Sequence, residues 1–185
     1  MAHGILIESK IAAKDIDALN RSVVAEEDVD AGSLLALTAP STVGSDVWTV
    51  AKPSANALTG LWLAYYPTNR ITKIDDLEFA GLSNDDRRYT NIAGKTFDAF
   101  KPKVGDEIEV SIDCVLAADK NAVVDGDFLE SKAGEFKFAR QTKATGATAG
   151  HTAFQVEYTK KYRFPKTHGI GDVDVKFFRA VCVAE

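Results

Sequence analysis

The chain has 185 residues, of which 45% are hydrophobic and 26% charged, and its formal net charge is −5. This composition is ordinary for a globular fold and argues against wholesale disorder, and no apolar run approaches the length needed to span a membrane. The first residues lack the basic segment and long apolar stretch of a signal peptide, so we expect an intracellular product. The length suits one large β domain or two small lobes that share a core.

Residues 1–22 are predicted to form an extended N-terminal arm in front of a mainly β domain over 23–185. Ile5 and Ile7 can alternate as a short strand, whereas Asp residues weaken any helix over 11–19. Arms of this kind often pack on a neighbouring molecule. We therefore expect this segment to bind a partner and to contribute little to the core of its own domain.

Apolar runs bounded by proline and glycine predict the strands of the domain. Leu58–Tyr66 is apolar on both faces, which indicates a central strand. Residues 70–100 are charged and weakly periodic, and they predict an irregular connection between two lobes, of the kind that carries binding. The other expected strands are 33–38, 47–50, 107–115, 121–130, 135–141, 152–164 and 172–183.

Four short stretches share one layout, in which a Gly next to Asp or Ser leads into an alternating apolar run. Glycine tolerates positive φ at a tight turn, and the neighbouring polar side chain can satisfy turn amides. Gly105 and Gly126 are therefore expected to have positive φ. The repeated turn-and-strand units predict a mainly β fold, either a small barrel or a sandwich. These units lie at 29–35, 104–108, 124–129 and 170–173.

Charge is distributed unevenly along the chain. Residues 1–100 hold 9 basic and 14 acidic residues, a balance of −5, whereas residues 101–185 hold 13 of each. Within 131–169 there are 8 basic residues and 2 acidic ones, a balance of +6. Such a segment can attract an acidic partner or a neighbouring copy of the chain. The alternative is a solvated hairpin whose charges protect a sheet edge from aggregation.

No catalytic or metal-binding motif stands out. Cys114 and Cys182 lie in alternating apolar strands, which favours two buried thiols over a disulfide or a catalytic Cys–His pair. The sequence has no nucleophile elbow, no zinc-type ligand spacing and no phosphate-binding glycine loop. The carboxylates of Asp125 and Asp127 could approach a calcium ion, but a turn role fits them better.

Two sets of aromatic residues give weaker indications of a function. The segment 160–164, KKYRF, has the local look of a nucleic-acid contact, but the acidic chain argues against such a partner. Trp48, Trp62, Tyr65 and Tyr66 could stack on a sugar if they were exposed. Trp62 lies between leucines, which instead favours a place in the core.

The stretch from Arg88 to Asp106, RYTNIAGKTFDAFKPKVGD, is similar to sequences in structural proteins of tailed bacteriophages. So is Ala31–Leu35, followed by Val47–Val50 and Leu58–Gly60. On these residues the chain resembles the capsid decoration, or cement, proteins that reinforce the outer shell of a phage head. The resemblance implies a small β-barrel or tulip-like fold and no enzymatic activity, cofactor or metal ion. It also implies the major capsid protein as partner and a place on the virion exterior after synthesis in the host cytoplasm. The uneven charge allows self-association on the capsid, and the acidic composition and the short apolar runs lead us to expect no nucleic-acid or membrane partner.

The expected function is therefore that of a non-enzymatic virion protein that binds the outside of a capsid and stabilises the shell. The alternative is a carbohydrate- or host-surface-binding β module, such as a component of a head fibre. The arm and the 70–100 connection supply the expected contacts, because neither has a convincing strand pattern. The candidate capsid-binding residues are Ile5, Ile7, Lys10, Ile11, Arg87, Arg88 and Tyr89.

Overall fold

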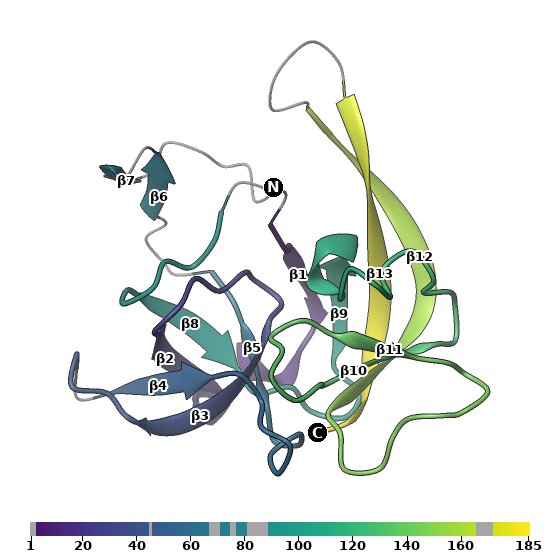
Figure 1. The fold of residues 1–185 in the computed structure, drawn as a ribbon, viewed down its shortest axis with the longest axis horizontal. Helices are drawn as coiled ribbons and strands as arrows, with labels where there is room; N and C mark the ends of the chain where they lie inside the picture. The colour runs from purple at the N-terminus through teal and green to yellow at the C-terminus, as the bar shows by residue number, and fades with distance from the viewer. Residues whose placement is uncertain (1–2, 45, 67–70, 75–76, 81–88, 166–171) are drawn as a thin grey trace.

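The computed structural model describes residues 3–44, 46–66, 71–74, 77–80, 89–165 and 172–185, and it confirms a mainly β fold (Figure 1). The strands are β1 Leu6–Lys10, β2 Asn20–Ala25, β3 Leu34–Pro40, β4 Val47–Ala51, β5 Trp62–Ala64, β6 Ile71–Ile74, β7 Leu77–Ala80, β8 Thr96–Phe100, β9 Glu107–Ser111, β10 Phe128–Glu130, β11 Ala139–Gln141, β12 Ala153–Pro165 and β13 Asp172–Ala184. The short 3-10 helices are η1 Ala12–Lys14, η2 Asp17–Leu19 and η4 Ile112–Cys114.

Five strands close into a small barrel in the order β2-β4-β3-β5-β8. The β2–β4 pair is parallel, and the other pairs are antiparallel. Alternate side chains point inward, as the period of two in a strand requires. Phe136, which comes from outside the barrel strands, packs into the same cluster and completes the barrel core. The buried members of this cluster are Val23, Ala25, Val29, Leu35, Val50, Trp62, Ala64, Phe97, Ala99 and Phe136.

A six-stranded antiparallel sheet lies against the barrel, in the order β1-β9-β13-β12-β10-β11. Its inward face and the outer face of the barrel share a second core, which includes Phe154 and Phe178 from the sheet and Leu63 and Phe100 from the barrel. Strand β5 lies between the two cores, because Leu63 joins this second core while Trp62 joins the barrel interior. The prediction of a central strand, apolar on both faces, is confirmed here.

The expectation of an arm over residues 1–22 is wrong for the segment that contains β1. Strand β1 pairs antiparallel with β9, with Leu6 opposite Val110, and so forms one edge of the sheet. Ile5, Leu6 and Ile11 are between 2% and 7% exposed. This segment buries too much apolar surface to be a detachable arm, and it is part of the fold.

The irregular connection predicted over 70–100 is also replaced in part by strands. β6 and β7 form a hairpin, and β8 closes the barrel between β2 and β5. Asn91, which lies before β8, is 1% exposed and exchanges two backbone hydrogen bonds of 2.8 Å with Val29. Weak apolar periodicity did not predict these elements. The partners of β8 lie far away along the chain, in β2 and β5, whereas β6 and β7 pair with each other.

The turn units are confirmed at two of their glycines. Gly105 has φ 96° and Gly126 has φ 89°, in the left-handed region that glycine accepts without strain. Asp106 accepts hydrogen bonds from the backbone N–H groups of Ala12 and Lys103 at 2.9 and 2.8 Å. Each Gly–Asp unit thus fixes a turn, and Asp106 also anchors the N-terminal segment to the start of β9.

Both cysteines are free and buried, as expected, although Cys114 lies in η4 and not in the strand predicted over 107–115. Cys114 is 3% exposed and Cys182 is 1% exposed. Burial raises the pKa of each thiol to about 12. Neither thiol is therefore a thiolate at neutral pH, and both act as core residues.

Candidate interaction surface

Strands β12 and β13 continue beyond the rest of the sheet as a two-stranded ribbon. They pair from Ala153 opposite Ala184 to Pro165 opposite Asp172. Strand β9 pairs with β13 only over 177–181, and β10 pairs with β12 only over 153–155. Residues 157–165 and 172–176, here called the ribbon, therefore have no third strand beside them within the described part of the chain. Figure 1 shows the ribbon extending away from the body.

A buried carboxylate holds the ribbon where it leaves the sheet. Glu109 on β9 is 4% exposed and accepts hydrogen bonds from Lys160 Nζ at 2.7 Å and from the Tyr162 hydroxyl at 2.6 Å. Arg179 Nη1 on β13 lies 3.5 Å from the same carboxylate. These four residues, the Glu109 network, join β9, β12 and β13 through charge-assisted hydrogen bonds, which are stronger than neutral ones.

The network controls the protonation of its members. Burial alone would raise the pKa of Glu109, but hydrogen bonds from Lys160 and Tyr162 and the positive charges of Lys160 and Arg179 lower it overall. The hydrogen bond to Glu109 raises the pKa of Lys160, and the same carboxylate raises the pKa of Tyr162. At neutral pH Glu109 and Lys160 are therefore both charged, and Tyr162 keeps its hydroxyl proton.

Arg179 extends this polar surface over the neighbouring strands. It pairs with Glu107 on β9 and, through Nε at 3.3 Å, with Glu157 at the start of the ribbon. Lys10 on β1 reaches Glu107 with Nζ at 3.1 Å. The face of the sheet turned away from the barrel is thus a continuous set of ion pairs from β1 to β12.

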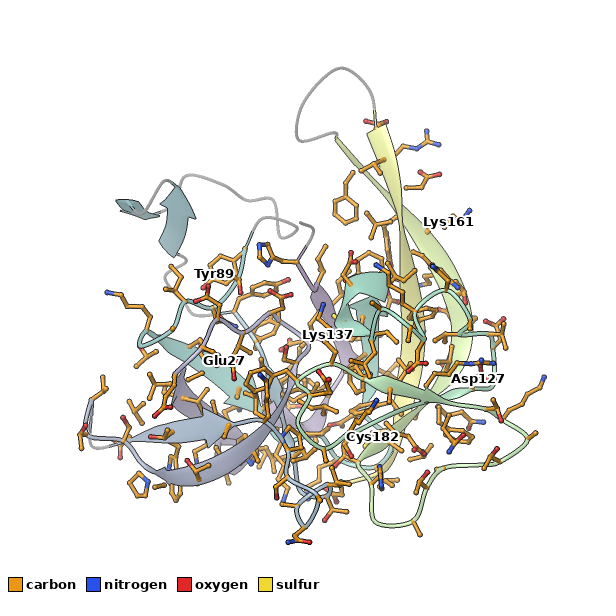
Figure 2. All side chains as sticks on the ribbon, viewed as in Figure 1. Glu27, Tyr89, Asp127, Lys137, Lys161 and Cys182 are labelled. Carbon is orange, nitrogen blue, oxygen red and sulfur yellow. The ribbon has the colours of Figure 1, made fainter. Side chains whose placement is uncertain are left out.

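The two faces of the ribbon differ in chemistry. On one face the ring of Tyr162 meets Phe177 edge-on at 5.0 Å, and Phe164 stacks on Phe177 at 6.2 Å. The other face carries Arg163, whose Nε lies 3.4 Å from Asp174, and the exposed Lys161. Figure 2 shows Lys161 on the outer part of β12, away from the body. One side of the ribbon therefore carries aromatic rings together with Lys160, whereas the other carries only charged and polar groups such as Lys161 and Arg163.

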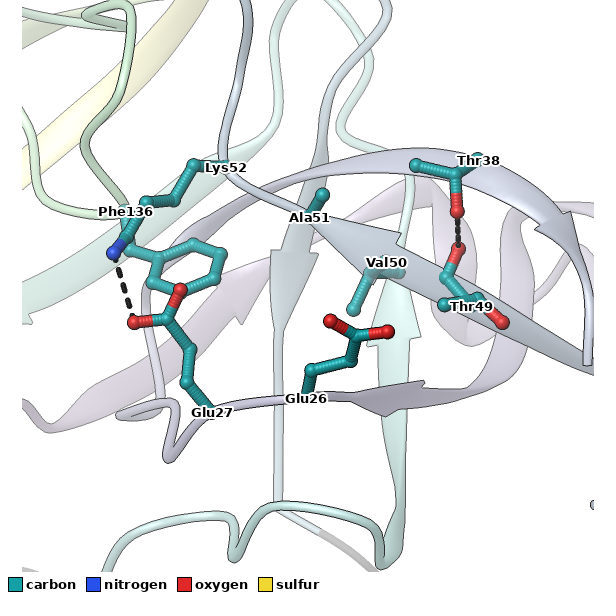
Figure 3. A pocket seen from close by; sticks show the side chains of 8 residues that line it. All are labelled: Glu26, Glu27, Thr38, Thr49, Val50, Ala51, Lys52 and Phe136. Carbon is teal, nitrogen blue, oxygen red and sulfur yellow. Dashed lines mark hydrogen bonds and ion pairs between the residues drawn. The ribbon is translucent and has the colours of Figure 1, made fainter.

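The mouth of the barrel holds a separate pocket of about 450 Å³ (Figure 3). Lys52 lies over the ring of Phe136 at 5.2 Å and pairs with Glu27 at 2.8 Å. The Thr38 hydroxyl donates to the carbonyl oxygen of Thr49 at 3.0 Å. In Figure 3 Lys52 binds Glu27 and Thr38 binds Thr49, while the exposed Glu26 is joined to neither pair, so a single carboxylate of the lining is left to face the hollow.

A second hollow of about 480 Å³ lies beside η2 and the start of β2. Its lining includes Asp17, Arg21 and Asp98, and the Arg21 guanidinium is 6.0 Å from the ring of Trp62. In the described ranges, no group of three or more His, Cys, Asp or Glu side chains is placed to hold a metal ion. Among the same residues, no helix has the length and apolar character needed to cross a membrane.

The predicted capsid-binding residues differ in their exposure to solvent in the structure. Ile5 and Ile11 are buried, as is Tyr89 at 5% exposure, and these three side chains belong to the core rather than to a surface. Ile7 is half-buried, and Lys10 has a side chain that is 75% exposed. Arg87 and Arg88 lie outside the described residues. Of the predicted set, the described surface retains Lys10 and part of Ile7.

The Glu109 network was not predicted from the sequence. One signal for it exists, since Glu107 and Glu109 alternate with the apolar Ile108 and Val110 and so occupy the opposite face of β9. The partners of Glu109 lie 51 to 70 positions away in the sequence, and only the strand order brings them together. Alternation in the sequence thus indicates which face of β9 Glu109 occupies, whereas only the strand order of the sheet determines which residues contact it.

In comparisons with known proteins, no family model, curated protein or solved structure gives a significant match to this chain.

Proposed function

We propose that this chain is a non-enzymatic structural protein that binds the outer surface of a tailed-phage capsid and stabilises the shell. Its partner is the major capsid protein, and its place is the exterior of the virion. The ribbon is the observation that carries this proposal. It exposes charged and aromatic side chains on an element that adds little to the core of the protein itself.

A ribbon without a third strand is only marginally stable alone, so it needs support from its base or from a partner. The Glu109 network supplies the base, because Lys160 and Tyr162 fix β12 against β9. The remaining surface includes Tyr158, 37% exposed, and the cation of Arg163. Tyrosine and arginine are the side chains enriched where proteins bind proteins.

The resemblance to shell proteins also supports this proposal, but it concerns the barrel and not the ribbon. Its quoted stretches fall on β3, on β4 and around β8, and these three strands belong to the barrel. They therefore describe the scaffold rather than the contact surface. In this proposal the barrel is the part shared with other shell proteins, and the ribbon is the part that contacts the shell.

The alternative of a sugar-binding module loses its main support. Trp62 is 7% exposed and Tyr66 is 5% exposed, and a stacking platform must be open to solvent. Trp48 is only partly exposed and packs against the barrel core. No observation on the aromatic residues favours this second function, and it is kept as one outcome of the experiment below.

The experiment uses capsids assembled from the major capsid protein encoded in the same genome. A protein that binds the assembled lattice, and not its dissociated subunits, stabilises the assembly by mass action. We expect co-sedimentation with capsids, no binding to free subunits, and a higher disassembly temperature for decorated capsids. Binding should weaken as salt rises, because charged surfaces take part. Equal heat resistance and no co-sedimentation would overturn the proposal and leave the surface-binding module ahead.

A further inference from the structure

We propose that the pocket at the mouth of the barrel binds a primary alkylammonium group, which is the chemistry of a lysine side chain or of a free amine. In this assignment the carboxylate of Glu26 holds the ammonium, and the apolar wall of the pocket holds the carbon chain. The inference goes beyond capsid binding and does not rest on it, because the lining of the pocket includes no residue of the ribbon.

The pocket has an apolar wall that the barrel core keeps in place. Its lining includes Val50 and Ala51 on β4 and Phe136, which enters the barrel from outside its strands. Val50 is 3% exposed and Phe136 is 9% exposed, so packing in the core fixes both side chains. A volume of about 450 Å³ lies in the range of small-ligand sites. The hollow therefore has room for an ammonium group with several carbon atoms.

The charges of the pocket are not balanced. Glu26 and Glu27 are negative and Lys52 is positive, which leaves a balance of −1. Lys52 Nζ lies 2.8 Å from Glu27, and this ion pair has no net charge. No ion pair or hydrogen bond joins the Glu26 side chain to another of the described residues. Figure 3 shows its carboxylate between the Lys52–Glu27 pair and Thr49, directed toward Val50. One uncompensated carboxylate thus lies beside the apolar wall.

The side chain of Lys52 shows how this pocket accepts a cation. Its ammonium lies 5.2 Å from the centre of the Phe136 ring while it pairs with Glu27. An aromatic face and a carboxylate both attract an ammonium group. A lysine of the protein itself therefore occupies one part of the pocket, and Glu26 offers a second carboxylate for a ligand of the same kind.

The lining disfavours other classes of ligand. A phosphate or a carboxylate would be repelled by two carboxylates at short range. Calcium and magnesium ions need about six oxygen ligands, whereas Glu26 is the one carboxylate here that has no cation beside it within the described residues. A sugar needs an open aromatic face, but Phe136 is nearly buried and Lys52 lies over its ring. A singly charged organic cation is the class that remains.

The exposure of Glu26 sets the expected strength of binding. Glu26 is exposed, and an ion pair at an exposed carboxylate contributes little because water screens the charges. The apolar wall adds contacts with only a few carbon atoms. We therefore expect a dissociation constant of about 1 mM for pentylammonium. Lys52 competes with this ligand, because it holds the second carboxylate and the aromatic ring.

An NMR titration of the full chain tests the class of ligand. Pentylammonium is added to isotope-labelled protein, and the amide signals of Glu26 and Ala51 should shift until they reach saturation. Pentanol has the same carbon chain without the charge and should bind at least about threefold more weakly. A capped Ala-Lys-Ala peptide is titrated in parallel to distinguish the two sources of the group. Binding of the peptide would identify a lysine side chain as the ligand, and binding of the free amine alone would identify a small molecule.

Two substitutions test the roles of the charged residues. Glu26→Gln should weaken the binding of pentylammonium about threefold, because it removes the uncompensated charge. Lys52→Met should strengthen binding about threefold, because it frees Glu27 from the internal cation. Lys10→Met and Glu157→Gln make the same changes on the sheet, outside the pocket, and should have no effect. The amide spectrum of each variant also reports whether it is folded.

Four results would overturn the inference. They are the absence of saturating shifts with both ammonium probes, equal binding of pentanol, unchanged binding by a folded Glu26→Gln variant, and weaker binding by Lys52→Met. The comparison of pentylammonium with pentanol uses the wild-type protein and so does not depend on any variant. All titrations use the protein without capsids, so failure here leaves the co-sedimentation test of capsid binding intact.

Discussion

The β12–β13 hairpin contains two regions with the same backbone pairing and opposite surroundings. In the body region Phe154, Phe178 and Ala180 are fully buried against the barrel. In the ribbon region Lys161 and Arg163 face solvent, and no third strand lies beside them among the described residues. One pair of strands thus supplies both a core element and an exposed surface.

If the ribbon is the binding element, as proposed, the difference separates the residues that stabilise the protein from those that recognise its partner. The body region is stabilised by the burial of apolar side chains, and this contribution to the free energy of unfolding is large and does not depend on ionisation. The ribbon gains its position from the Glu109 network, which is polar and depends on ionisation. Substitutions in the two regions should therefore affect different measurements.

The largest effect is expected from loss of the N-terminal segment, which belongs with the body. Deletion of residues 1–13 removes β1 and the buried side chains of Ile5, Leu6 and Ile11. We expect the cooperative thermal unfolding transition seen by circular dichroism to disappear. Lys10→Ala, which changes an exposed residue of the same strand, should leave the transition in place. A truncated protein that unfolds cooperatively would show that the segment is an arm after all.

The next largest effect separates the body from the ribbon on one strand. Phe154→Ala leaves a cavity in the shared core and should lower the free energy of unfolding by about 3–5 kcal/mol. Arg163→Ala, on the same strand but in the ribbon, should change it by less than about 0.5 kcal/mol. Urea denaturation measures both. Similar losses for the two variants would remove the distinction between the regions.

A smaller effect is expected at the junction of the two regions. Glu109→Gln should cost about 1–3 kcal/mol at pH 7, because Lys160 and Tyr162 lose a charged acceptor. The pKa of Glu109 is lowered in the fold, so its contribution is complete above the unfolded value of about 4.3 and is lost as the pH falls through the lowered folded value. The difference from wild type should therefore shrink at pH 3. Glu26→Gln, at an exposed site, should show no such pattern.

The smallest effect on stability is expected from a cysteine introduced into the ribbon. Its rate of reaction with a thiol reagent should nevertheless differ strongly from that of the two buried cysteines. Cys114 and Cys182 should resist a thiol reagent in the native protein, because both are buried and their pKa values are raised to about 12. A cysteine placed in the ribbon by Val173→Cys should react at once with no loss of stability. Rapid labelling of the wild-type protein would show that the body opens more easily than its packing indicates.

Local patterns predicted much of the body from the sequence. The alternation around Cys114, the apolar run at Leu58–Tyr66 and the Gly105–Asp106 turn each depend on neighbours within a few residues. Cys114 is buried and Gly105 has positive φ, as expected. The strands are shorter than expected, because β5 covers only Trp62–Ala64 and β9 ends at Ser111, before Cys114. The strands of the hairpin were also predicted within two residues of their observed bounds. Periodicity and turn chemistry are local, and the sequence displays them directly.

Features that depend on distant pairing were not predicted. Leu6 pairs with Val110, more than a hundred positions away, and the short run around it gave no sign of which strand it would join. The same holds for the Glu109 network. The length of the ribbon depends on where β9 and β10 stop pairing, and no local pattern specifies that. For this reason the predicted binding residues lie on the N-terminal segment and at positions 87–89, and none of them lies on the ribbon.

The most direct test of the account removes the outer ribbon and keeps the body. Replacing residues 163–174 by Asn-Gly joins Tyr162 to Val175, which already lie opposite each other, through a turn suited to a hairpin. The change preserves Lys160, Tyr162 and Glu109. Co-sedimentation with capsids is then compared between this variant and the wild-type protein, both at a concentration where each is folded. We predict that the variant keeps its unfolding transition and no longer sediments with capsids. Undiminished capsid binding by a folded variant would contradict the claim that the ribbon is the binding element.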